Sequence, residues 1–280
     1  MYFLVQRLSL QVFDFLAYGV SLSLRAPKSF WQHLEGLVLA NWVARDRGAC
    51  QLVVEVQEVG SGYSLWFDGV RQAVPGIPER ICEYLERWLY FEIAQRCTSK
   101  VFVHAAALAF RGHVLLIPGV SCSGKSTLAA ALLELEQGVE YLSDEYAIVG
   151  SDGAVTAFPC SLGLRRPGQA KWFRSAASLG WKPCLDGLPL GWVLSWPYHS
   201  SMRPRLVAGS AGQAALALLR NSMSPLEANP NRVLQALSRA CQGVRFASGV
   251  RDDVRLSARR LLEFCEQRRP HERFHSSFAV

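Results

Sequence analysis

Residues 114–127 read Val114-Leu115-Leu116-Ile117-Pro118-Gly119-Val120-Ser121-Cys122-Ser123-Gly124-Lys125-Ser126-Thr127, and the fold prediction starts from them. It matches the pattern GxxxxGK[ST] at every fixed position. The two glycines allow the backbone to wrap a phosphate, so that main-chain N–H groups point at the anion. The lysine brings a cation to the terminal phosphates, and the serine after it supplies a hydroxyl ligand for magnesium. The pattern therefore predicts a site for ATP with Mg²⁺, made by Gly119, Val120, Ser121, Cys122, Ser123, Gly124, Lys125, Ser126 and Thr127.

The segments around this loop predict a strand–loop–helix unit. Val101–Phe110 is a continuous apolar run, followed by the turn Arg111-Gly112 and a second apolar run, Val114–Ile117. A turn that short forces an antiparallel pair of strands, because a parallel return needs a crossover of about a dozen residues. Lys125–Leu135 then has the apolar spacing of a helix, and Tyr141–Val149 that of a further strand.

Two acids stand at the start of this last predicted strand. Asp144 lies 19 positions after Lys125, which leaves room for a short helix that brings the chain back to the phosphate loop. One acid of the pair Asp144-Glu145 could then ligate magnesium and the other could accept a proton from a nucleophile. The alternative is a solvated turn before a strand. His104 lies in the strand that pairs with the loop strand, either as a buried core histidine or near the phosphates.

The first hundred residues predict a smaller α+β region. Residues 2–13 alternate like a strand, and Ser29–Ala44 suggests a helix. A meander follows, with strands at Gln51–Val59, Tyr63–Phe67 and Val70–Val74. The region ends in a helix, for which we expect the bounds Pro78–Cys97.

Beyond Pro159 the pattern weakens, because proline, glycine and tryptophan are frequent up to Pro204, and we expect irregular loops there. A short strand is predicted at Arg205–Ala208. Ser210 is a good N-cap for a helix that reaches Arg220. Two more helices are predicted at Asn231–Cys241 and Asp252–Glu266, and the tail from Gln267 is expected to be mobile.

Composition favours a globular protein of the cytoplasm. Hydrophobic residues make up 50% of the 280 residues and charged residues 19%, which argues against disorder. No apolar run reaches the roughly 18 residues of a membrane span, and no signal peptide is expected at the N-terminus. The eight cysteines are widely spread with no CxxC pair, so we expect free thiols in a reducing compartment.

The formal net charge of +7 is compatible with an acidic partner but specifies none. Much of the excess comes late in the chain, and we interpret it as a solvated helix face and a loose tail, so no nucleic-acid partner is expected. The late arginines are Arg251, Arg255, Arg259, Arg260, Arg268, Arg269 and Arg273.

Three segments together carry a family resemblance. They are residues 103–107 (VHAAA), residues 111–118 (RGHVLLIP) leading into the loop, and residues 142–145 (LSDE). They resemble the C-terminal domain of HPr serine kinase/phosphorylase, and more closely the HPr kinase-related proteins of bacteria. This superfamily also holds the ATP-dependent phosphoenolpyruvate carboxykinases. The match covers about residues 100–165.

The resemblance implies an α/β fold with an HPr kinase-like mixed-sheet P-loop core over residues 99–280, after an N-terminal α+β region over residues 1–98. It implies an ATP- and magnesium-dependent kinase acting on a hydroxyl. Asp144 would be the general base and Glu145 would help hold the metal with Ser126, while His104 matches the family's histidine upstream of the loop. Members are often oligomers, which leaves a homo-oligomer open.

The chain also departs from the family pattern. The acid pair is Asp-Glu rather than Asp-Asp, and Cys122 replaces a glycine, either as a tolerated small side chain or as a thiol whose pKa the helix N-terminus lowers. The HPr-binding signature is missing, so the acceptor is not expected to be HPr. Arg165-Arg166 would either clamp a phosphate or be surface charge.

Two functions remain open from the sequence. The first is a kinase that moves the γ-phosphate of ATP to a hydroxyl of a peptide, a protein or a small molecule, with Asp144, His104 and Lys125 at the reaction centre. The second is a regulatory module that binds ATP or hydrolyses it slowly without an acceptor. A nucleic-acid-dependent ATPase would rest on charge alone.

Overall fold

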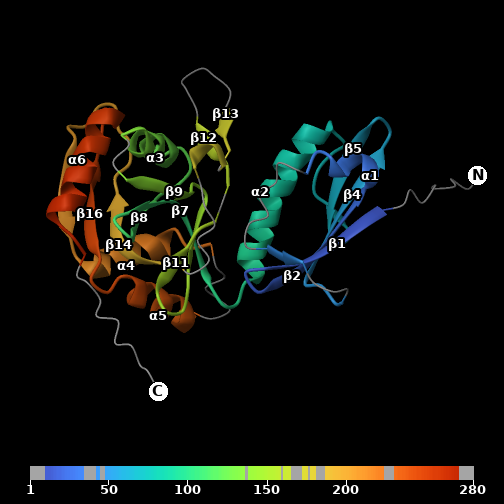
Figure 1. The fold of residues 1–280 in the computed structure, drawn as a ribbon, viewed down its shortest axis with the longest axis horizontal. Helices are drawn as coiled ribbons and strands as arrows, with labels where there is room; N and C mark the ends of the chain where they lie inside the picture. Colours follow the sequence, from blue (N-terminus) through green and yellow to red (C-terminus); the bar gives the residue numbers. More distant parts are fainter. Residues whose placement is uncertain are drawn as a thin grey trace, which may run out of the picture. The chain divides into compact units, whose positions relative to one another are not determined.

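The computed structural model describes residues 10–34, 42–44, 48–135, 138–158, 160–164, 172–175, 177–180, 187–223 and 230–270. The chain forms two compact units, Met1–Ser99 and Lys100–Val280. Both combine strands with helices, so the predicted α/β class is confirmed at that level (Figure 1). No helix among the described residues is long and apolar enough to cross a membrane.

The described residues of the N-terminal unit form a six-stranded sheet and one long helix. The sheet order is β3-β1-β2-β4-β5-β6, and every neighbouring pair is antiparallel except β2 and β4. The long helix α2 starts with a proline at its first turn, where the missing N–H costs nothing, and it buries an apolar stripe of Ile81, Leu85, Leu89 and Ile93. The elements are β1 (Leu10–Ala17), β2 (Val20–Pro27), α1 (Lys28–Trp31), β3 (Trp42–Ala44), β4 (Leu52–Val59), β5 (Gly62–Phe67), β6 (Val70–Arg71) and α2 (Pro78–Arg96).

The C-terminal unit is built on an eight-stranded mixed sheet. The order along its main path is β11-β10-β7-β8-β14-β16-β15, with β9 also pairing with β7. A further pairing of β11 with β14 closes part of this path on itself. The strands are β7 (Val101–Phe110), β8 (His113–Pro118), β9 (Val139–Ser143), β10 (Tyr146–Val149), β11 (Ala154–Thr156), β14 (Leu188–Ser195), β15 (Arg205–Gly209) and β16 (Arg245–Val250), and β12 (Leu162–Leu164) pairs with β13 (Trp172–Arg174) separately.

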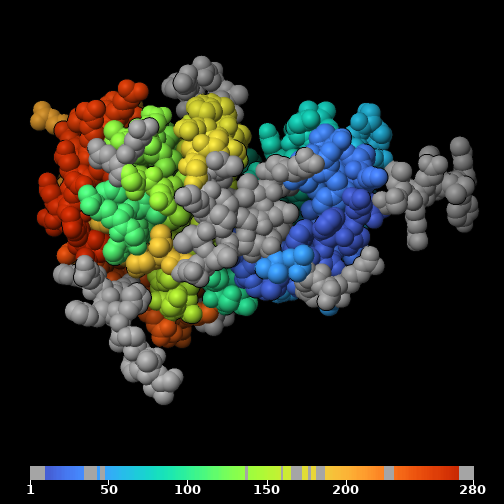
Figure 2. All heavy atoms as spheres, viewed as in Figure 1, coloured from blue at the N-terminus to red at the C-terminus, as the bar shows by residue number. Residues whose placement is uncertain are grey.

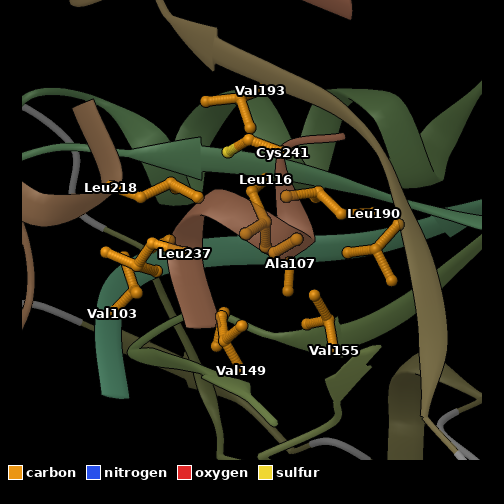
Figure 3. Close-up of a cluster of buried hydrophobic side chains, with 14 of the residues drawn as sticks. Val103, Ala107, Leu116, Val149, Val155, Leu190, Val193, Leu218, Leu237 and Cys241 are labelled. Atoms are coloured by element: carbon orange, nitrogen blue, oxygen red, sulfur yellow. The ribbon is translucent and has the colours of Figure 1, made fainter. Parts of the chain in front are cut away.

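Helices cover both faces of this sheet, which explains why its central strands are apolar throughout. Odd-numbered residues of β7 from 101 to 109 pack with α4 (Ala211–Arg220) and α5 (Pro230–Ala240), in the cluster of Figure 3. Even-numbered residues from 106 to 110 pack with α3 (Lys125–Glu134) and α6 (Val254–Gln267). The hairpin of β12 and β13 lies beside α3, where Figure 2 shows its yellow spheres next to the green ones.

Several predicted elements are confirmed. β7 and β8 form the expected antiparallel pair, and α3 follows the loop as expected. Ser210 caps α4 in a capping box with Gln213. The predicted helices around α2, α5 and α6 are present to within a few residues at either end.

The predicted helix over Ser29–Ala44 is wrong in its described part. Only Lys28–Trp31 is helical, and Trp42–Ala44 is a strand that pairs antiparallel with β1. An aromatic and a β-branched residue favour an extended chain once an open strand edge offers hydrogen bonds.

The single strand predicted over Tyr141–Val149 is two strands. Ser143 pairs with Ala107 and Tyr146 pairs with His104, so β9 and β10 lie along the same edge of β7 with a bend between them. The two acids therefore lie in that bend and not at the start of a strand.

The loops expected between Pro159 and Pro204 contain a central strand of the sheet, β14. It runs parallel to both β8 and β16, with an irregularity between Leu190 and Trp192. Gly191 stands at this irregularity because the backbone passes close to His113: a Cβ at residue 191 would lie 2.8 Å from that of His113. β16 was likewise not predicted.

Candidate active site

The loop between β8 and α3 is shaped as a cradle for an anion. It ends at Gly124, the N-cap of α3, whose φ of 86° is left-handed, and Cys122 also has a positive φ of 65°. The Gly119 N–H donates to the carbonyl of His104 at 3.4 Å, which ties the start of the loop to β7. The N–H groups at the start of a helix lack intrahelical partners and carry a partial positive charge, so they favour an anion here.

The side chain of Lys125 folds back against this loop. The residue is 7% exposed, and its ammonium donates to the carbonyls of Gly119 at 2.7 Å and Val120 at 3.1 Å. A buried ammonium needs such acceptors to offset its lost hydration. A phosphate oxygen in the cradle would offer a charged acceptor in place of these neutral ones.

Asp144 is a buried carboxyl that faces the start of α3. It is 5% exposed, and its Oδ2 accepts from the Gly163 N–H at 3.3 Å. Its Oδ1 is buried without a hydrogen-bond partner among the described residues. Burial raises the pKa of Asp144 to about 6, against the opposing effect of the Ser126 hydroxyl, which hydrogen bonds to the carboxyl.

His104 and Glu145 lie beside this carboxyl. The His104 Nε2 is 3.9 Å from the Glu145 Oε1, and the histidine is paired with Tyr146 across the strands. Burial and the positive charge of Lys125 lower the pKa of His104, while Glu145 raises it. The imidazole is therefore mainly neutral at pH 7, which suits a hydrogen-bonding role better than that of a fixed cation.

The donor set around the start of α3 fits magnesium. It consists of oxygens: the Ser126 hydroxyl and the carboxylates of Asp144 and Glu145, of which Glu145 has a side chain 47% exposed. Among the described residues no group of three or more His, Cys, Asp or Glu side chains could hold a metal alone. Magnesium commonly binds through one or two carboxylates and completes its shell with phosphate oxygens and water, so this sparse set suits it.

The sheet register brings these groups together. Pro118 pairs with Ala105 and Ser143 pairs with Ala107, so β8 and β9 lie on the two sides of β7 and their carboxyl ends lie at the same end of the sheet.

Within the loop, the side chains of Val120, Ser121, Cys122 and Thr127 are exposed. The Ser123 hydroxyl is buried, with no partner among the described residues. Arg165 and Arg166, predicted either to clamp a phosphate or to be surface charge, lie outside the described residues.

Sequence reasoning missed two residues at this edge, Tyr198 and Arg251. The assignment of Arg251 to a solvated helix face is wrong, because it is 2% exposed and its Nη2 donates to the carbonyl of Gly124 at 2.7 Å. Arg251 directly follows β16, and that strand was not predicted. An arginine just after a parallel strand could have been a signal, since ligands bind at the carboxyl ends of such strands.

Gly124→Ala is expected to destabilise the protein more than Gly112→Ala. Both glycines have left-handed φ values, 86° and 75°, so both substitutions cost about 1–2 kcal/mol of backbone strain. A Cβ at residue 124 would also clash with the Arg251 guanidinium, whereas a Cβ at residue 112 would meet nothing within 4 Å. We expect a further loss of about 1–3 kcal/mol from this overlap, measured by urea denaturation. Equal losses for the two variants would contradict the close packing of Arg251 on the loop.

Comparison with known proteins gives likenesses in structure but none in sequence. No family model matches the chain, and no curated protein matches its sequence. The Hpr(Ser) kinase/phosphatase from Coxiella burnetii is similar in structure, with 13% identity over 59% of this chain and 96% of that one, at a TM-score of 0.35. A likeness of this size carries no argument about activity, which has to come from the residues of the site.

Proposed function

We propose that this protein is an ATP- and magnesium-dependent phosphotransferase that moves the γ-phosphate to a hydroxyl of a peptide, a protein or a small molecule. The observation that supports this most is the buried Asp144 carboxyl, with one oxygen that has no partner among the described residues, beside a loop that carries Lys125 and Ser126. A phosphate cradle alone accounts for binding. A poised carboxyl next to it supplies the proton acceptor that transfer to a hydroxyl needs.

Each residue then has a defined task. The loop N–H groups and the Lys125 ammonium hold the β- and γ-phosphates and stabilise charge on the transferring group. Ser126 and Glu145 would hold magnesium, which would supply positive charge to neutralise the phosphates. Asp144 accepts the proton of the attacking hydroxyl, and His104 with Glu145 borders the place where that hydroxyl arrives.

Labelled ATP tests this function directly. The protein is incubated with [γ-³²P]ATP, Mg²⁺ and a panel of peptides, proteins and small hydroxyl compounds, and label on the acceptor is compared with label released to water. A phosphotransferase places label on one acceptor class, whereas the alternative regulatory module releases phosphate to water only. DNA or RNA added to the reaction should leave turnover unchanged.

We also propose that the protein works in a reducing compartment such as the cytoplasm. Seven cysteines in the described part of the chain are free thiols, and the eighth, Cys184, lies outside it. Free thiols are typical of cytosolic proteins, where disulfides are rare.

The pH dependence of kcat/KM should have an acid limb near pH 6. Asp144 must be ionised to accept a proton, and burial raises its pKa to about 6, so activity should fall about tenfold per pH unit below that value. His104 is a second titratable group at this site, and burial lowers its pKa from the usual 6.5, so the His104→Gln variant serves as control. If the limb persists in His104→Gln, the carboxyl causes it; its disappearance would assign the limb to the imidazole and contradict the role of Asp144.

A further inference from the structure

Tyr198 is an exposed aromatic residue fixed against the glycine-rich loop. Its backbone N–H donates to the carbonyl of Ser123 at 3.1 Å. On either side, the Arg251 N–H donates to Pro197 at 3.1 Å and the His199 N–H donates to Arg251 at 2.9 Å. The chain around Tyr198 is therefore anchored both to the loop and to the residue that follows β16, while 53% of the tyrosine remains exposed.

Arg251 supports this tyrosine from behind. Its guanidinium lies 5.8 Å from the centroid of the Tyr198 ring and also binds the Gly124 carbonyl. Its Nε is buried without a hydrogen-bond partner among the described residues, and no ion pair joins it to a described carboxylate. Burying a guanidinium with few hydrogen-bond partners costs folding free energy, so we expect Arg251 to have a role in the site that offsets this cost.

The two flanks of the loop differ in chemistry. The two acids lie on the β7 side of the loop, because they follow β9, which ends at the same end of the sheet as β8. On the other side, β14 and β16 run parallel to β8. The segments that follow these two strands bring Tyr198 and Arg251 to the same end of the sheet as the loop. A nucleoside triphosphate carries its γ-phosphate and its base at opposite ends, so a γ-phosphate placed at Asp144 leaves the opposite flank of the loop for the nucleoside. That flank carries the exposed tyrosine.

We propose that Tyr198, held by Arg251, is the surface on which the base of the bound nucleoside triphosphate stacks. The inference rests on the proposed function and adds the position of the nucleoside to it. Stacking on one aromatic face does not depend on hydrogen-bond readout, because every base has a π face. The site should therefore accept ATP and GTP with similar affinity.

Calorimetry with two ligands separates the base from the phosphates. ATP and inorganic tripolyphosphate, each with Mg²⁺, are titrated into the wild type, Tyr198→Ala and Tyr198→Phe. We expect Tyr198→Ala to weaken ATP binding by about 5-fold or more, the effect of losing one stacked base. Tripolyphosphate binding should stay the same, and Tyr198→Phe, which keeps the ring, should retain affinity for both ligands.

The outcomes are distinct. Equal weakening of both ligands in Tyr198→Ala would show a structural role for the residue and overturn the inference, as would an unchanged ATP affinity. A wild type that binds tripolyphosphate as tightly as ATP would also overturn it while leaving the proposed function intact. A wild type that binds neither ligand with magnesium would contradict the proposed function itself.

Discussion

Asp144→Asn is expected to remove phosphoryl transfer while leaving ATP affinity nearly unchanged. The substitution keeps the size of the side chain and its ability to accept from Gly163, but it removes the carboxylate that we propose takes the proton. General-base catalysis is worth about 10²–10⁴-fold, so the transfer rate should fall by that factor. Rapid-quench measurement of labelled acceptor, together with calorimetry of MgATP binding, checks both parts.

The same variant should be more stable than the wild type above pH 6. Burial raises the pKa of Asp144 from 3.8 to about 6, so ionising it costs folding free energy as the pH rises through that range. A shift of about two pKa units corresponds to about 3 kcal/mol of unfolding free energy. The wild type loses this stability fully above pH 6, whereas the variant with the neutral asparagine keeps it. The difference between the two proteins should vanish near pH 4. Urea denaturation at pH 8 and pH 4 measures it.

Glu140→Gln is the matched control for this pair of results. Glu140 lies in the same strand that leads to Asp144 but is exposed. Removing its charge should change neither transfer nor the pH dependence of stability. Transfer at the wild-type rate by Asp144→Asn would refute the role of Asp144 as base, and equal stability at pH 8 would refute a costly buried carboxylate.

Local signals predicted the centre of this fold well. The apolar run of β7, the two-residue turn at Arg111-Gly112 and the helix after Lys125 depend on neighbours in sequence, and all three are confirmed. The return of Asp144 to the edge of the loop also followed from length, because a helix of ten residues leaves little choice of route. Chain geometry over short distances was therefore enough to bring the loop and the acids together.

Long-range pairing could not be predicted in the same way. β14 contains Pro189 and Gly191 and is followed by Pro197, so its sequence is typical of a loop, yet it is stabilised as a strand by β8 and β16 on its two sides. Arg251 was misassigned for the same reason. Its burial depends on three segments that are far apart in the chain: the loop before α3, the segment around Tyr198 and the end of β16. The bend at Asp144 likewise arises because β9 and β10 share one edge of β7.

Lys125→Ala is expected to weaken ATP binding by about 30-fold or more. The ammonium is buried, with two carbonyls of the loop as its acceptors, and we propose that it contacts the terminal phosphates. Losing a buried charged partner costs about 2–5 kcal/mol, which corresponds to a weakening of about 30-fold to several thousand-fold. Calorimetry with MgATP measures the loss.

Two further variants separate charge from folding in this experiment. Lys125→Met keeps the length of the side chain and removes its charge, so it should bind as poorly as Lys125→Ala while unfolding at a similar urea concentration to the wild type. Lys28→Ala, at an exposed lysine of the N-terminal unit, should bind normally. If Lys125→Met retained wild-type affinity, the ammonium would not contact the phosphates. The loop would then have to hold the nucleotide by its main-chain N–H groups and by Ser126, and the assignment of Lys125 to the reaction centre would be wrong.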